Sequence, residues 1–531
     1  MTDAGRIGRR GFLTLAGAAG VAGAGAVPAA ADPQPAEPGP GSRPSTPDRV
    51  VYTLPALEFA DPARQRLFGD QYESALTDVV GMNTVYAERA TYDPARLLSY
   101  PPGTFVRAGG GYPAPQRWTR DAAVNAWNAV SLLGPPVGRN TLLSVVDRTD
   151  GGLVVQQDNQ WWDQIVWVLG AHHHWLVTGD AEFLARAHEI GVATLAARKA
   201  QNFSAAHGLF TGPSFMNDGI AGYPEPPWQP GVKSSFVLDY PLTHELMCLS
   251  TNCLYHGAYT ALAEMADALG KDGRAHLADA ARLRTAINRS LWRPDAGTYG
   301  YFLHGDGSLD VSQEGAGLAF AILSGVAGPA QITRLLSTVH WEPHGIVNSW
   351  PHFARFDDAK PGRHNVVVWP MVHSFFGEAL ARAGRAELFG RALTNLAELV
   401  AATDGGFYEI YDSKTGAVQG GWQTGGSGEP EQFTSQPDQA WSASGYLRMV
   451  FAGLFGLTFT ADGLRLAPCL PPGWGPVTLR GLRYRAATLD ITLRGSGSRV
   501  VSCTVDGLPA AATLHPNLTG SHEIRLTLAA P

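Results

Sequence analysis

The sequence predicts a mainly helical protein: an (α/α)6 barrel of six helical hairpins closed in a ring, followed by a small C-terminal β-sandwich-like domain. Apolar residues recur at helical spacing from about residue 119 to residue 457, in stretches that are alternately apolar all round and polar on one face. After Leu457 the pattern changes to the apolar–polar alternation of strands with one buried face. An open α-solenoid is the alternative, but no fixed repeat of about 34 or 40 residues is visible.

Twelve helices are expected, in alternating inner and outer positions. Ala181–Lys199 and Arg274–Ser290 have one polar face, which is typical of outer helices, whereas Trp161–Trp175 and Val366–Phe376 are apolar almost all round, which is typical of inner helices. The expected helices lie near residues 64–82, 120–134, 138–148, 160–178, 181–203, 244–270, 273–291, 314–325, 330–338, 366–384, 387–402 and 437–457.

The N-terminal segment has the features of an export signal. Gly8-Arg9-Arg10-Gly11-Phe12-Leu13 is a twin-arginine pattern; an apolar stretch of small residues and an Ala29-Ala30-Ala31 cleavage site follow it. We therefore expect a secreted, periplasmic or cell-surface protein. The expected organisation is a signal peptide over residues 1–31, a Pro-rich tether over 32–48, a lead-in over 49–118, the barrel over 119–457 and the β domain over 458–531.

Composition limits the classes of partner. The 531 residues include 14 Trp, only 16% are charged, and the net charge of −7 argues against nucleic acid or an anionic membrane as the main partner. No apolar run is long enough to span a bilayer. A long, weakly charged, Trp-rich chain suits a neutral polar ligand such as a sugar.

No cofactor or metal is expected. The three consecutive residues His172-His173-His174 point about 100° apart on a helix and cannot converge on one ion. The four cysteines are too few for a disulfide scaffold, although Cys469 and Cys503 lie in one strand-rich segment and could pair.

Candidate sugar-binding residues precede apolar helices, because the starts of the inner helices of such a ring open onto one cavity. Arg120 and Asp121 can donate to and accept from neighbouring hydroxyl groups, and Trp118 can stack on a sugar face. Asp158 and Trp162 form a second candidate edge. The structural alternatives are a capped helix with an ion pair for the first group, and an N-cap with core aromatics for the second.

The candidate general acid is Asp218, in the loop Phe215-Met216-Asn217-Asp218-Gly219. An apolar surround of Phe, Met and Tyr223 disfavours the charged form of a carboxyl group, as a general acid near neutral pH requires. Glu225 is the competing acid in this loop, and an ordinary Asp-Gly turn is the structural alternative.

The candidate base is Glu409, within the segment Phe407 to Asp412, where carboxylates alternate with aromatic rings. Glu429 and Glu431 are alternative bases or substrate ligands, and buried acids paired with Arg are the structural alternative. Trp369 and Trp441 open two further helices and suit ring stacking, although Trp is as common in a core.

Taken in order, these motifs resemble those of the six-hairpin (α/α)6-barrel glycoside hydrolases, nearest to the group of glycoside hydrolase family 63, the trehalases and the debranching-type α-glucosidases. The resemblance covers roughly residues 115–495, and Asn217, between Met216 and Asp218, is a departure from the acid-loop pattern of the group. The segments that carry it are Arg120-Asp121, Phe215 to Gly219, Asn252-Cys253-Leu254-Tyr255, Trp369-Pro370, Phe407 to Asp412, Gln439 to Ala443 and Leu464 to Trp474.

The resemblance implies an exo-acting, inverting hydrolase of an α-linked glycoside, glucose being the default sugar, with Asp218 as acid and Glu409 as base. Three alternatives stay open. A disaccharide phosphorylase would use phosphate in place of water, a polysaccharide lyase would use the barrel on uronic acids, and a sugar-binding protein would keep the barrel without its chemistry.

Overall fold

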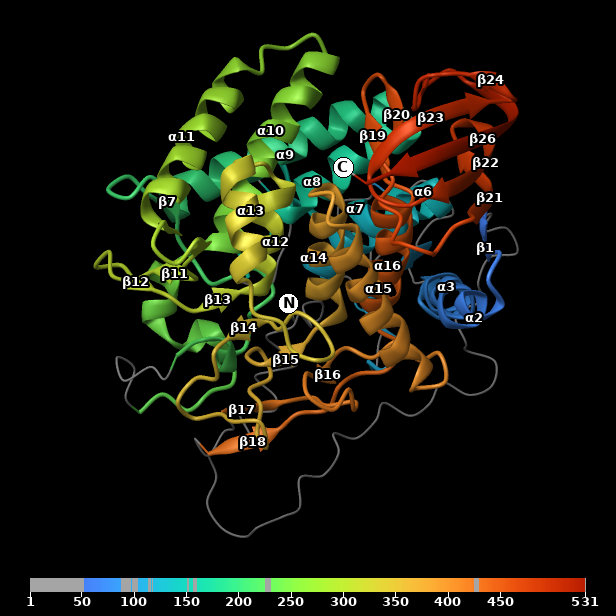
Figure 1. The fold of residues 1–531 in the computed structure, drawn as a ribbon. Helices are drawn as coiled ribbons and strands as arrows, with labels where there is room; N and C mark the ends of the chain where they lie inside the picture. The colour runs from blue at the N-terminus through green and yellow to red at the C-terminus, as the bar shows by residue number, and fades with distance from the viewer. Residues whose placement is uncertain are drawn as a thin grey trace, which may run out of the picture.

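A computed structural model describes residues 52–86, 97, 104–112, 116, 118–149, 152–155, 160–224, 231–424 and 429–530. The twin-arginine segment and the Pro-rich tether lie outside these residues. Most of the described chain is a helical barrel, and a sheet domain built from the C-terminal strands lies against one side of it (Figure 1).

Within the part of the chain that the structure describes, six inner helices form a closed ring. Each inner helix packs on the next, and the last packs on the first, so the open solenoid is excluded. They are α5 (Thr119–Asn125), continued by η4 (Ala126–Val130) and α6 (Ser131–Leu133), then α8 (Val166–Thr178), α10 (Leu249–Ala268), α12 (Gly315–Leu323), α14 (Pro370–Arg382) and α16 (Ala440–Arg448), continued by η8 (Met449–Leu454).

The outer helices cover the ring and keep one polar face in water. In α11 (Arg274–Ser290) only Ala280, Leu283, Ala286 and Ile287 are buried, as expected of an outer helix. The others are α2 to η3 (Pro62–Met82), α7 (Pro135–Leu143), α9 (Ala181–Asn202), α13 (Pro329–Thr338) and α15 (Ala386–Ala401). The fold class predicted from the sequence is therefore confirmed.

Three inner helices begin later than the sequence predicts. α8 begins at Val166 because residues 161–165 form turns, in which the Asp163 N–H donates to the Gln160 carbonyl over 3.1 Å. Before α10, β8 (Met247–Cys248) pairs with β11 (Phe302–Leu303). Before α14, β15 (Val367–Val368) pairs with β16 (Tyr411–Asp412). Apolar residues continue through these segments, so helical periodicity alone placed the starts too early.

The C-terminal domain contains a six-stranded sheet in the order β1-β21-β22-β26-β23-β24 and a smaller sheet, β19-β20-β25. In β22 (Ala486–Gly495) alternate residues are buried, as the strand pattern predicts. The other strands are β19 (Leu457–Thr460), β20 (Gly463–Leu466), β21 (Val477–Tyr484), β23 (Arg499–Val505), β24 (Leu508–Pro509), β25 (Thr513–Leu514) and β26 (Thr519–Ala529).

Strand β1 (Ala56–Phe59) belongs to the lead-in yet pairs antiparallel with β21 at the edge of the larger sheet (Figure 1). This pairing joins two distant parts of the chain, and no local pattern in the sequence indicated it. The suggested disulfide is absent: all four cysteines are buried and unbonded. No helix among the described residues is long and apolar enough to cross a membrane.

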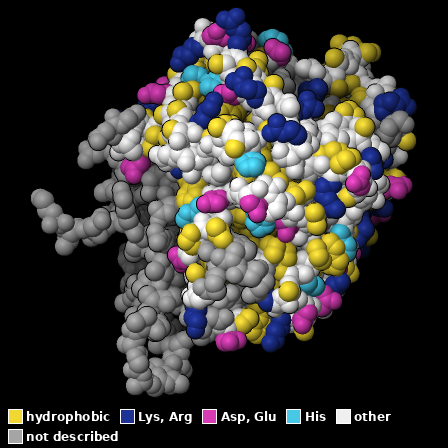
Figure 2. Space-filling view, turned by 90° about the vertical axis from the view of Figure 1, so that its left-hand side faces the viewer, with side chains coloured by type: hydrophobic (Ala, Val, Ile, Leu, Met, Phe, Trp, Pro, Cys, Tyr) yellow, Lys and Arg dark blue, Asp and Glu magenta, His cyan; other side chains and the backbone are white. Residues whose placement is uncertain are grey.

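The surface shown in Figure 2 carries basic and acidic side chains interspersed with apolar ones, without one dominant sign of charge. This mixture fits the modest net charge of the chain.

Candidate active site

The predicted site residues gather where the inner helices begin. Arg120 lies in the first turn of α5, Trp369 immediately precedes α14, and Trp441 lies in the first turn of α16. Six short strands lie at this same end of the barrel, toward the bottom of the view in Figure 1: β13 (Gln313–Glu314), β14 (Ser349–Trp350), β15, β16, β17 (Trp422–Thr424) and β18 (Pro430–Gln432). Residues far apart in the sequence are thereby brought to one mouth of the ring.

Asp218 is one of two carboxylates on Arg120. The Arg120 Nη2 group donates to Asp218 Oδ2 over 3.2 Å, and its Nη1 group donates to Asp163 Oδ2 over 2.5 Å. The Asp163 side chain is fully buried, whereas that of Asp218 is 15% exposed. Asp163 lies closer to the guanidinium and is more deeply buried than Asp218, so it is the tighter ion-pair partner of Arg120. Of the two carboxylates on Arg120, Asp218 is the one that reaches the solvent.

His364 contacts the other carboxylate oxygen of Asp218. Its Nε2 atom lies 3.4 Å from Asp218 Oδ1, and its ring stacks on Trp369 with a centroid distance of 4.9 Å. The stacking fixes the plane of the imidazole, so the contact with Asp218 has a defined direction.

Glu409 forms the second carboxylate centre. The Arg363 Nη2 group donates to Glu409 Oε2 over 2.7 Å, and the Tyr112 hydroxyl donates to Oε1 over 3.4 Å. The Glu409 side chain is 5% exposed. A buried carboxylate needs such a partner, because an unpaired charge would not stay ionised away from water.

One pair of consecutive residues connects the two carboxylates. Arg363 holds Glu409 and His364 contacts Asp218, and their Cα atoms are about 3.8 Å apart as neighbours in the chain. The indole N–H of Trp369 donates to the Arg363 carbonyl over 2.8 Å and fixes this turn.

Aromatic rings pack against the residues that hold the two carboxylates. The Trp441 ring packs on Trp369 with a centroid distance of 5.9 Å and lies 5.4 Å from the Arg120 guanidinium. Trp118 packs edge-on against Tyr112, with a centroid distance of 5.0 Å. One carboxyl group that can protonate a leaving group and one buried carboxylate that can activate water therefore belong to one cluster.

The loop that carries Asp218 is held on both sides. The Asn217 side chain is buried, donating to the Tyr301 hydroxyl and accepting from the Asn348 amide, each over 2.5 Å. Asn217, the residue that departs from the acid-loop pattern of the resembled group, therefore points into the protein. Asp218 is the residue that reaches Arg120 and His364.

Glu314, at the start of α12, supports the same loop. It lies at the N-cap of α12, fully buried, and accepts hydrogen bonds from the hydroxyls of Ser214 and Ser250 and from the Ser250 N–H. Burial raises the pKa of Glu314 to about 7, and the three hydrogen bonds oppose that shift.

This shift predicts a pH-dependent stability. The folded protein holds the Glu314 proton more tightly than the unfolded chain does, so ionisation of this group lowers the free energy of unfolding as pH rises from about 4.5 to about 7. Between pH 4 and pH 8 the free energy of unfolding of wild type should fall by up to about 3 kcal/mol relative to that of Glu314→Gln. Urea unfolding of both proteins across this range measures the difference. Parallel stability curves would contradict the expectation.

Several residues predicted to bind substrate are not part of the contact network around Asp218 and Glu409. Trp162 is fully buried in a cluster with Tyr223, and the Tyr223 hydroxyl donates to the Asn217 carbonyl, so both support the acid loop and are not placed against a substrate. Glu429 and Glu431 are exposed, Glu431 on β18 (Pro430–Gln432). Asp121 is buried beside Arg120. Asp158 and Glu225 lie outside the described residues.

Sequence reasoning did not single out Asp163, Arg363, His364 or Tyr112 as site residues. The usable signal was a polar run, Arg363-His364-Asn365, directly before the apolar segment that leads into α14. Asp163 was not singled out because the predicted helix began near residue 160 and therefore placed Asp163 inside it.

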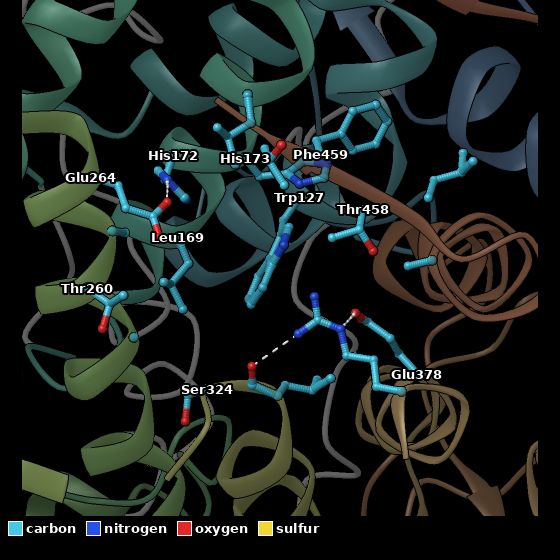
Figure 3. Close-up of a pocket in the computed structure, with 18 of the residues that line it drawn as sticks. Trp127, Leu169, His172, His173, Thr260, Glu264, Ser324, Glu378, Thr458 and Phe459 are labelled. Atoms are coloured by element: carbon cyan, nitrogen blue, oxygen red, sulfur yellow. Dashed lines mark hydrogen bonds and ion pairs between the residues drawn. The ribbon is translucent and has the colours of Figure 1, made fainter. Parts of the chain in front are cut away.

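A separate cavity of about 580 Å³ lies near the other ends of the inner helices and is lined by Trp127, His172, Glu264, Glu378 and Phe459, among others (Figure 3). Two of its carboxylates are engaged: Glu378 pairs with Arg448, and Glu264 lies 3.0 Å from His172. No group of His, Cys, Asp or Glu within the described ranges could hold a metal ion. The contact network around Asp218 and Glu409 is the better candidate for catalysis.

Comparison with protein families gives two matches. Residues 155–442 match the model described as the mannosylglycerate hydrolase MGH1-like glycoside hydrolase domain, and residues 457–513 match the glycosyl hydrolase family 65 C-terminal domain. The first match covers more than half of the chain and contains Asp218, Arg363, His364 and Glu409. A search of curated proteins found no match.

Solved structures align over most of this chain, and the two with TM-scores above 0.5 share its fold. A structure titled as a sialidase aligns over 81% of this chain and 37% of its own, with 15% identity and a TM-score of 0.59. A family 78 rhamnosidase of Bacillus sp. GL1 aligns over 91% and 44%, with 16% identity and a TM-score of 0.53. A family 63 mannosylglycerate hydrolase of Thermus thermophilus aligns over 72% and 100%, with 16% identity and a TM-score of 0.48. This chain spans less than half the length of the first two.

Proposed function

Because the chain belongs to the MGH1-like family of glycoside hydrolase domains, we propose that it is an exo-acting, inverting hydrolase of an α-linked glycoside, with Asp218 as general acid and Glu409 as general base. That the chain is a glycoside hydrolase follows from its family; the mode of attack, the sugar and the residue roles are the proposal. The resemblance of the six-hairpin motifs supports inversion and an α-linked substrate.

The observation that carries the residue roles is the single network that joins the two carboxylates through Arg363 and His364. Asp218 would donate its proton to the departing glycosidic oxygen. Glu409 would take a proton from a water molecule that attacks the anomeric carbon from the opposite face. Arg363 compensates the charge of Glu409 before the proton arrives. Arg120 keeps Asp218 oriented while Asp163 shares the guanidinium charge.

The charged groups of the site are paired with one another, Arg120 with Asp163 and Asp218 and Arg363 with Glu409, which suits an uncharged sugar. Glucose is the first sugar to test, and mannose and rhamnose follow, because mannosylglycerate hydrolase is in the family description and a rhamnosidase shares the fold. The test is a panel of α- and β-nitrophenyl glycosides, disaccharides and mannosylglycerate, each with and without phosphate. Phosphate-independent release of one sugar from its α-glycoside is expected. Phosphate-dependent release would indicate a phosphorylase, and an unsaturated product a lyase.

We also propose export through the twin-arginine route, on the strength of Arg9-Arg10 and the apolar stretch that follows. Replacing both arginines with lysine should leave the uncleaved precursor inside the cell. Normal processing of that variant would contradict this route.

A further inference from the structure

The buried carboxyl group of Glu314 has no part in the chemistry proposed above, yet it lies directly beneath the acid loop. It comes from the start of α12, whereas Ser214 immediately precedes the acid loop (Phe215 to Gly219) and Ser250 belongs to the first turn of α10. One carboxyl group therefore ties three separate segments together through the Ser214 hydroxyl, 2.5 Å from Glu314 Oε1, and the Ser250 hydroxyl and N–H.

The local backbone leaves room for this carboxyl group. A Cβ atom on Gly317 would lie 2.3 Å from Glu314 Oε2 and 2.8 Å from a methyl carbon of Leu249. Any larger residue there would displace the carboxyl group from its position over the first turn of α12. Ser250 extends the same support, because its hydroxyl also accepts from the Phe215 N–H over 3.1 Å.

Met216 shows why the loop needs such an anchor. Its φ of +76° lies in the left-handed region, which is strained for a non-glycine residue and persists only where the surroundings determine it. Ser214 and Phe215 are held on one side of Met216 by Glu314 and Ser250, and Asn217 is held on the other by Tyr301 and Asn348. Asp218 follows immediately.

We propose that Glu314 is a positioning residue for the general acid: through Ser214 and Ser250 it keeps Met216 in the left-handed conformation and so directs the carboxyl group of Asp218 toward the glycosidic oxygen. The inference rests on the proposed function of Asp218. Loss of the anchor allows Met216 to relax to an ordinary φ, which changes the direction of the next two residues. The expected defect is in proton donation and leaves sugar binding intact.

The test compares Ser214→Ala and Glu314→Gln with wild type on the best substrate of the panel and on its nitrophenyl glycoside. Both variants should lower kcat about 10- to 100-fold on the natural-type substrate, whose leaving group needs a proton, with little change in KM. The loss on the nitrophenyl glycoside should be several-fold smaller, because that leaving group departs with little help. In an Asp218→Asn background, Ser214→Ala should have no further effect.

Two controls separate this role from a general loss of stability. Leu283→Ala removes a buried side chain from outer helix α11 and should lower the melting temperature while leaving kcat near wild type. Ser214→Thr, which keeps the hydroxyl, should retain more activity than Ser214→Ala.

The outcomes distinguish the positioning role of Glu314 from the general-acid role of Asp218. If Asp218→Asn removes activity but Ser214→Ala and Glu314→Gln match wild type on both substrates, the positioning role is wrong. It is also wrong if both variants lose activity equally on the two substrates, or only in proportion to stability as Leu283→Ala does. If Asp218→Asn itself retains activity, the proposed acid is wrong.

Discussion

Glu409→Gln is expected to lower kcat about a thousandfold, within the range that general acid–base groups contribute. Gln has the size and shape of Glu, and its amide oxygen can still accept from Arg363, but it cannot take a proton from water. Arg363 keeps its hydrogen bonds to the carbonyls of Gly420 and Thr434, so the variant should fold. The measurement is kcat under substrate saturation, with thermal unfolding as the check on folding.

The chain offers matched controls for this prediction. Glu429 and Glu431 are acids of the same kind, close in sequence, and exposed. Glu429→Gln and Glu431→Gln should therefore keep kcat within about twofold, since substitutions of exposed residues usually have small effects. Near-full activity in Glu409→Gln would remove Glu409 from the role of base, and a large loss in either control would transfer the role to that residue.

Asp218→Asn should lower kcat by about 10²- to 10⁴-fold on a substrate whose leaving group is a sugar or an alcohol. Asn can still accept from Arg120 but has no acidic proton to give. A nitrophenyl leaving group is stable as an anion, so the loss on that substrate should be much smaller. This dependence on the leaving group distinguishes a missing acid from a missing base, which should impair both substrates alike.

Asn217→Ala tests the neighbouring position in the departure from the acid-loop pattern. Asn217 is bonded to Tyr301 and Asn348, so its loss should lower stability and activity on both substrates. A loss in Asn217→Ala with the leaving-group dependence expected of Asp218→Asn, together with normal activity in Asp218→Asn, would contradict the assignment of the acid.

The barrel was predictable because the inner helices are apolar nearly all round and the outer ones have one polar face, a difference that the sequence records directly. The strands of the C-terminal sheet were predictable for the same reason, since β22 buries every second residue. The place of β1 in that sheet was not, because its pairing with β21 joins segments at opposite ends of the chain.

Candidate site residues could be nominated from the sequence, but their partners could not. Asp218 and Glu409 stood out as acids among aromatic residues at barrel-mouth positions. Arg363 and His364 acquire meaning only when the turn before β15 sets one against each carboxylate. Glu314 looked like the start of a helix, and its contact with Ser214 depends on how α10 and α12 meet.

The most direct test of the central claim, a single displacement by water with Asp218 as acid and Glu409 as base, is proton NMR of the first sugar released from the best α-glycoside. Spectra recorded in the first minutes, before mutarotation, should show the β-anomer forming first, and Glu409→Gln should form it far more slowly. Initial formation of the α-anomer would contradict the account, because it requires a double displacement in which a protein carboxylate attacks the sugar.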